Sequence, residues 1–216
     1  HGLAQGADDY VVKPFDINNL IHRMEALLRV SADRAGRDPI ADIPAAGATK
    51  REVQRRVSLG EEFALAYIEL QHIREFARQY GEEPRAKAIR RLARALQQAG
   101  RNFPSSAFFC GHMGGGHFVC VLPPGKANAY CDLVRRVWEH HLERFYTSIG
   151  HPQAYAAAKR RESSSPLLDV LICLTTREAK GMTAPHELFE TLSQLRAKAS
   201  LARQGGIYVD RRGVNG

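Results

Sequence analysis

The 216-residue sequence lacks the features of membrane and secreted proteins. No apolar run approaches the roughly 20 residues that a bilayer-spanning helix needs. The first residues, HGLAQGADDY, lack the basic and apolar zones of a signal peptide. The cysteines form no CxxC pair and no metal-ligand spacing; they are Cys110, Cys120, Cys131 and Cys173. These absences predict a cytoplasmic protein with reduced thiols and no membrane contact.

The sequence also has fewer acidic than basic residues, 23 Asp and Glu against 31 Lys and Arg, for a net charge of +8. Such a balance favours nucleic acid, anionic nucleotides or an acidic partner. No known DNA-reading or RNA-reading motif accompanies it, so nucleic-acid binding is not expected. The basic stretch PRAKAIRRLARAL (residues 84–96) leaves two interpretations open. It either attracts anionic partners or is a solvated arginine face around an apolar stripe.

Hydrophobic spacing predicts helices around a mostly antiparallel sheet, which is the α+β class. In the main part of the chain we expect strands at 63–70, 107–113, 117–122, 154–158, 168–174 and 207–210. Expected helices are 71–80, 83–99, 128–146 and 185–203, several of them ended by glycine. Before this part we expect a strand at 9–15, a helix at 16–29, an Ala-, Gly- and Pro-rich linker at 31–50 and a short helix at 51–58.

The stretch GADDYVVKPFDINNLIHRMEALLR closely resembles the last strand and helix of a response-regulator receiver domain. The resemblance implies that Lys13 is the switch lysine that contacts the phosphorylated aspartate in that family, and that a histidine kinase acts upstream. It also makes Leu20, Met24 and Leu27 candidates for contact in a homodimer. The phospho-acceptor would lie before this fragment, so no phosphotransfer is argued from it. We therefore assign residues 1–30 to an incomplete receiver domain and 31–58 to a linker and lead-in helix.

Residues 59–216 resemble a GGDEF domain, the diguanylate cyclase fold related to adenylyl cyclase and polymerase palms. Two stretches carry the resemblance, YIELQHIREFARQYG on the first strand and helix and GHMGGGHFVCVLP on the signature hairpin. In that family two divalent cations stabilise the attacking and leaving oxygens as cyclic di-GMP forms. The resemblance implies that an Asp on the first strand and the acid in the third position of the signature hold them.

This sequence departs from the family pattern at each of those points. Glu69 keeps a carboxylate at the first metal position, but the four signature positions read Gly114, Gly115, Gly116 and His117, without an acid. Mg²⁺ prefers hard oxygen ligands, and neither Gly116, which has no side chain, nor the imidazole of His117 supplies one. By the same resemblance, Ala77 and Ala86 stand where the family reads guanine, and SSAFF replaces its product-binding Arg-x-x-Asp. We therefore expect a degenerate, non-catalytic domain without a cofactor.

The favoured hypothesis is a signalling output module that relays receiver phosphorylation by binding a protein partner or by dimerising. One alternative is a sensor that binds a nucleotide without turnover, through Lys198, Arg203 and the amides of residues 114–116. A second is a weakly active cyclase. A transition-metal site is a further alternative, because His112 and His117 would face each other beside Glu69 if Gly114 and Gly115 formed the turn.

Overall fold

The computed structural model describes residues 36–160, 162, 165–177, 184–201 and 206–210. The receiver-like segment therefore lies outside the described residues, together with the expected functional positions Lys13, Leu20, Met24 and Leu27. Arg203, the second expected phosphate-binding residue, also lies outside them.

The described strands form one five-stranded sheet in the order β2-β3-β1-β4-β5. Their bounds are β1 (Phe63–Gln71), β2 (Phe109–Gly114), β3 (His117–Leu122), β4 (Asp169–Arg177) and β5 (Gly206–Val209). The pairs β2–β3, β3–β1 and β1–β4 are antiparallel, and only β4–β5 is parallel. The expected α+β class with a mostly antiparallel sheet is confirmed.

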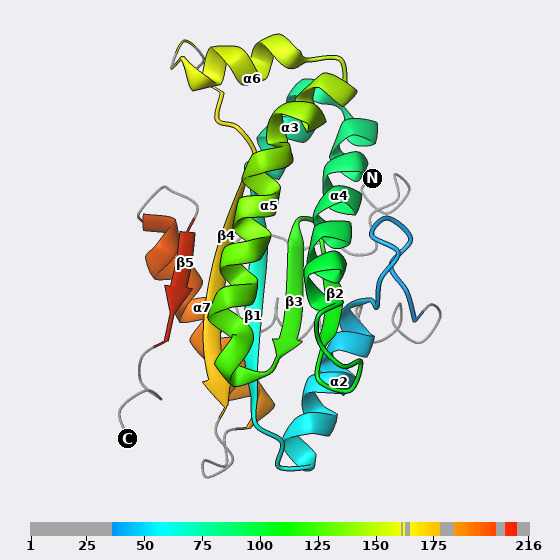
Figure 1. Ribbon diagram of the computed structural model, residues 1–216, viewed down its shortest axis with the longest axis vertical. Coiled ribbons are helices and arrows are strands. Elements are labelled where there is room, and N and C mark those ends of the chain that lie inside the picture. The colour runs from blue at the N-terminus through cyan, green and yellow to red at the C-terminus, as the bar shows by residue number, and fades with distance from the viewer. Residues whose placement is uncertain (1–35, 161, 163–164, 178–183, 202–205, 211–216) are drawn as a thin grey trace, which may run out of the picture.

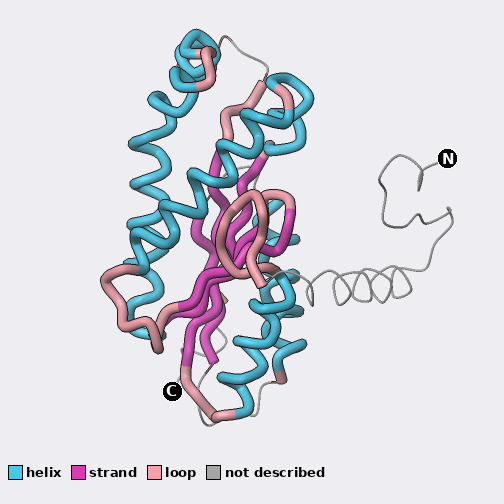
Figure 2. Tube along the Cα trace, turned by 90° about the vertical axis from the view of Figure 1, so that its right-hand side faces the viewer, coloured by secondary structure: helices cyan, strands magenta, loops and turns pink. Residues whose placement is uncertain are grey.

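Helices cover both faces of this sheet (Figures 1 and 2). They are α2 (Ala46–Ser58), α3 (Ile73–Tyr80), α4 (Glu82–Gly100), the 3₁₀ turn η2 (Pro124–Lys126), α5 (Ala127–Ser148), α6 (Pro152–Lys159) and α7 (Pro185–Leu201). The long helices α4 and α5 pack on one face, and α2 and α7 lie on the other. None of the described helices is both long and apolar enough to cross a bilayer.

Strand β1 is central because both of its faces are apolar. Its alternate residues Ala64, Ala66, Ile68 and Leu70 belong to the core under α4 and α5. The intervening Phe63 and Leu65 belong to the second core, under α2 and α7. Successive side chains of a strand point to opposite faces, so one strand of nine residues connects the two cores. The two charged or polar residues near its end, Glu69 and Gln71, lie on the α7 face by the same alternation.

The segment before α2 is packed against the domain, although its composition predicts a linker. Ile43 is fully buried and Ala41 is 6% exposed, and both belong to the core under α4 and α5. The backbone N–H of His112 donates to the carbonyl of Pro44 at 2.8 Å, so the segment lies along the outer edge of β2. Covering an edge strand blocks pairing with other chains. Helix α2 then begins at Ala46, five residues before the expected start.

One expected strand is wrong. Residues 154–158 lie in helix α6, which begins with Pro152 at its first helical position. The run AYAAAK is dominated by alanine, the strongest helix former, and contains no β-branched residue. A proline at the start of a helix costs nothing, because its missing N–H would have no intrahelical partner. Local propensity therefore outweighs the short apolar run that suggested a strand.

Replacing Ile43 with Ala tests whether the segment before α2 belongs to the folded unit. Removing three buried carbon atoms should lower the free energy of unfolding by about 2–5 kcal/mol, measured by urea denaturation. Leu59→Ala is the matched control, because Leu59 is 63% exposed and its truncation should change stability by no more than about 0.5 kcal/mol. Equal stability of the two variants would contradict the packing.

Candidate functional site

The signature hairpin turns directly over the end of β1. The register pairs Gly114 with His117, so Gly115 and Gly116 form the turn. Gly114 and Gly115 have φ values of 97° and 61°, a region that side chains rarely adopt. The N–H of Leu70 donates to the carbonyl of Gly116 at 2.8 Å, and His117 pairs with Glu69 across β1 and β3. The hairpin and the first metal position of the resemblance are thus brought together.

Position 116 is crowded for any side chain. A Cβ atom there would lie 3.0 Å from the Leu70 carbonyl oxygen, 3.1 Å from Ile73 Cγ2 and 3.2 Å from Leu70 Cβ. These separations are shorter than ordinary van der Waals contacts, and the nearest atom belongs to the backbone. The missing acid is therefore accompanied by close packing, since Leu70 or Ile73 would have to shift by a few tenths of an ångström to admit a Cβ at position 116.

The remaining carboxylate, Glu69, is held by an arginine from α7. Arg196 Nε donates to Glu69 Oε2 at 2.5 Å and Arg196 Nη2 donates to Oε1 at 3.0 Å, in a two-point ion pair (both oxygens engaged). Burial would raise the pKa of Glu69, but the hydrogen bonds and charge of Arg196, helped by His117 and Arg74, hold that pKa below its usual value. Glu69 is therefore an ionised carboxylate that a protein cation already neutralises.

His117 completes this cluster with Tyr67. The Tyr67 hydroxyl lies 2.7 Å from His117 Nδ1, and the two rings stack with their centroids 5.8 Å apart. Burial, together with the charges of Arg196 and Arg74, lowers the pKa of His117 in spite of Glu69. Burial and Glu69 raise the pKa of Tyr67, so the phenol keeps its proton and shares a hydrogen bond with the imidazole. The four side chains form a closed, paired group.

The prediction that His112 and His117 face each other across the hairpin is wrong. A β-bulge between His112 and Gly114 shifts the register, so that His112 pairs with Phe118. His112 therefore packs on the α4–α5 face, 4.7 Å between ring centroids from Phe118, while His117 lies on the α7 face. His112 Nδ1 lies 2.9 Å from Asp38 Oδ2, and its Nε2 lies 3.1 Å from the Gly115 carbonyl oxygen. Among the described residues, no three His, Cys, Asp or Glu side chains gather into a metal site.

Of the two expected phosphate-binding residues, Lys198 is exposed, and the carboxylate of Glu69 pairs with Arg196 on the same helix. Successive helix residues turn by about 100°, so Lys198 points some 200° away from Arg196. Arg196 follows Leu192 by four residues and precedes Ala199 by three, and both of these are buried. That spacing is the signal that would have identified Arg196 from the sequence. Ala77 lies on α3 and Ala86 on α4, and neither side chain can form a hydrogen bond.

Comparison with solved structures shows that the described part of the chain has the GGDEF-domain fold. The coiled coil and GGDEF domain of DgcB from Caulobacter crescentus, in complex with c-di-GMP, has a TM-score of 0.62 at 14% identity, covering 89% of this chain and 95% of that one. Diguanylate cyclase SiaD from Pseudomonas aeruginosa, in complex with its activator SiaC, also gives 0.62 at 14%, covering 90% and 69%. The FimX GGDEF domain of Pseudomonas aeruginosa gives 0.60 at 13%, covering 82% and 99%.

Sequence comparison finds much less. No protein-family model matches the chain. Response regulator ArlR from two strains of Staphylococcus epidermidis is 58% identical over 33 residues. This match covers 15% of this chain and 15% of the length of each of those relatives. The expected receiver segment therefore stays a prediction from its motif.

Replacing Arg196 with Gln should raise the pKa of Glu69, because burial would no longer be opposed by the arginine. In the wild type the folded-state pKa lies below the ordinary 4.5, so the stabilisation is present above about pH 4.5 and is lost as the pH falls through the folded value. The variant should lose less stability on acidification. Urea denaturation from about pH 7 to about pH 3 and carboxyl NMR titration measure both effects. Lys198→Gln, at an exposed residue of the same helix, is the control. If R196Q lost as much stability on acidification as the wild type, the Arg196–Glu69 ion pair would be contradicted.

Gly116→Ala tests whether position 116 is closed. The added methyl should force Leu70 or Ile73 to shift, lowering the free energy of unfolding by about 1–3 kcal/mol in urea denaturation. Gly125→Ala is the control, because a Cβ at Gly125 meets no atom within 4 Å. If G116A proved as stable as G125A, the turn would accept a side chain and the closed position would be disproved.

Proposed function

We propose that this protein is a non-catalytic signalling output module, a GGDEF-fold domain that acts by binding a protein partner and not by cyclising GTP. The observation that carries the proposal is the state of the two metal positions implied by the family resemblance. Glu69 is engaged at both oxygens by Arg196, and position 116 has no side chain and is crowded by Leu70 and Ile73. A domain with this arrangement keeps the scaffold and lacks the place for two cations.

Electrostatics supports the same conclusion. Two-cation catalysis needs carboxylates that hold the metal ions, and the metal ions in turn bind the phosphates of GTP. Here Arg196 contributes a positive charge at the carboxylate itself, and Arg74 and His117 lie close enough to lower the pKa of Glu69 further. A divalent cation would have to displace the guanidinium and then find only one carboxylate. Loss of a single transition-state stabiliser commonly costs about 10²–10³ in rate, and here a metal ligand and its acidic neighbour are both absent.

A route for the incoming signal is supported by contacts of the segment 36–45. Asp38 lies 2.9 Å from His112, and His112 in turn lies 3.1 Å from the Gly115 carbonyl oxygen in the hairpin turn. A shift of this segment would therefore move atoms of the signature turn. In our proposal, receiver phosphorylation changes the position of residues 16–29 and is relayed through residues 31–58 to this contact. The structural neighbour SiaD was solved with an activator protein, SiaC, which gives a precedent for a GGDEF domain bound by a partner.

The direct test is an activity assay on the intact regulator with GTP and either Mg²⁺ or Mn²⁺. We expect no cyclic di-GMP or pGpG by liquid chromatography, at a rate at least about 10³-fold below an active GGDEF enzyme assayed alongside. A pull-down with the same protein, with and without a small-molecule phosphoryl donor, should capture a partner in a phosphorylation-dependent way. Production of cyclic di-GMP at a rate near that of the active enzyme would refute the proposal.

A further inference from the structure

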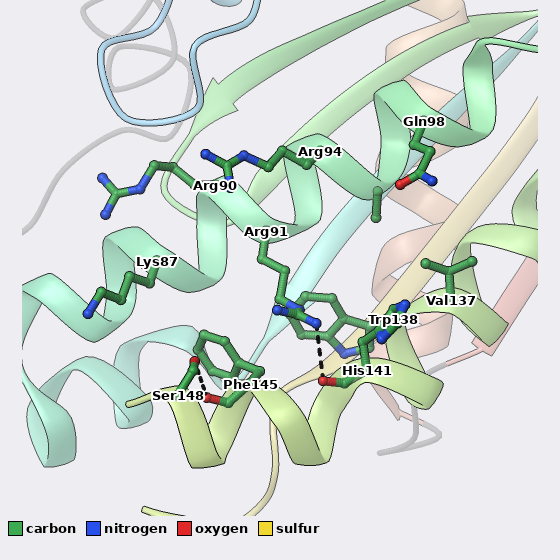
Figure 3. Close-up of a pocket in the computed structure, with 11 residues that line it drawn as sticks. Lys87, Arg90, Arg91, Arg94, Gln98, Val137, Trp138, His141, Phe145 and Ser148 are labelled. Carbon is green, nitrogen blue, oxygen red and sulfur yellow. Dashed lines mark hydrogen bonds between the residues drawn. The ribbon is translucent and has the colours of Figure 1, made fainter. Parts of the chain in front are cut away.

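A basic groove lies between α4 and α5 (Figure 3). These helices cover the face of the sheet opposite the Glu69 cluster. Its volume is about 350 Å³, within the size range of small-molecule sites. Four basic side chains from α4 line it together with polar and apolar side chains of α5, and none of the described lining residues is acidic. The residues that matter here are Lys87, Arg90, Arg91, Arg94, Trp138 and His141.

Two of these cations have no acidic partner among the described residues. Glu83 lies 3.7 Å from Lys87 and 3.5 Å from Arg90, and so balances the outer end of the row. Arg91 donates only to the backbone carbonyl of His141, at 3.3 Å, and Arg94 has neither an ion pair nor a hydrogen bond there. Arg94 is exposed to solvent, whereas Arg91 is half-buried, and a half-buried guanidinium without a carboxylate partner is a costly arrangement that a bound anion would relieve.

The inner part of the groove adds to this cost. Arg91 is half-buried and extends from α4 toward α5, beside Trp138 and His141 (Figure 3). Burial, and then the charge of Arg144, lowers the pKa of Arg91, which shows that the surroundings disfavour its positive charge. The Nδ1 atom of His141 is buried without a hydrogen-bond partner in the described structure. An anion seated here would supply the charge that Arg91 lacks.

We propose that this groove binds a small molecule that carries a chain of phosphate groups. The cations follow α4 over seven residues, a distance of about 10 Å at 1.5 Å per residue. A linear polyphosphate can meet most of them at once, whereas a single phosphate reaches fewer of them. Arginine guanidiniums suit the ligand because their fork geometry matches phosphate oxygens at two points. The binding site is separate from the Glu69 cluster, so the proposal holds whether or not the domain retains cyclase activity.

Trp138 gives a direct readout, because it is the single tryptophan of this sequence and lines the groove. Titration of the full chain with inorganic tripolyphosphate should change its fluorescence with a dissociation constant below about 1 mM, and calorimetry should give the same value. Orthophosphate should bind at least about tenfold more weakly, since it meets fewer cations. Added salt should weaken binding.

The variant R91Q/R94Q should bind tripolyphosphate at least about tenfold more weakly, because it removes two charge-assisted contacts. The control R101Q/R136Q removes the same charge at two exposed residues outside the groove and should bind within about twofold of the wild type. The single variant R94Q, at an exposed residue, should keep the fold and still lose affinity, and circular dichroism checks the fold of all variants. No response up to about 10 mM, equal losses in the two double variants, or equal affinity for orthophosphate would each overturn the proposal.

Discussion

The close approach of the hairpin turn to the end of β1 is the constraint on which the rest of the site depends. The hydrogen bond from Leu70 N–H to the Gly116 carbonyl fixes the turn within van der Waals reach of Leu70 and Ile73. Only a residue without a side chain fits there unless these neighbours move. The same contact sets the register that places His117 opposite Glu69. One backbone hydrogen bond therefore determines both which residue position 116 can hold and what faces the remaining carboxylate.

The charges around Glu69 follow from that geometry. A half-buried carboxylate with no cation beside it would be costly, and burial alone would favour its protonated form. Arg196 removes this cost with a two-point ion pair from α7, and the Tyr67–His117 hydrogen bond satisfies the neighbouring polar groups. In our proposal Glu69 stands at a metal position of the family, and there Arg196 would take the structural role of the metal without its Lewis acidity.

The order of strands and helices could be predicted from the sequence because the apolar periodicity of the long elements is strong. The strand expected at residues 154–158 is instead part of helix α6, because this segment is a short alanine run in which periodicity carries little information and helix propensity decides. The site was harder to predict. Motif positions identify Glu69, Gly116 and His117 from the sequence. Arg196 lies 127 residues after Glu69 in the chain, and only the packing of α7 on the sheet brings the two together. The bulge that separates His112 from His117 likewise depends on tertiary contacts, with Asp38 and Pro44 on one side of β2.

The two faces of the sheet differ in how their charges are balanced. On the α7 face the one functional carboxylate has a protein partner at each oxygen, so nothing in the cluster calls for a ligand. On the α4–α5 face Arg91 and Arg94 have no acidic partner in the described structure, although Arg91 is half-buried. Selection for stability alone would favour pairing or replacing the half-buried Arg91, since an unpaired charge of this kind lowers stability. Part of the net basic charge of the chain lines the groove between α4 and α5, where, in our proposal, a bound anion offsets the cost of Arg91.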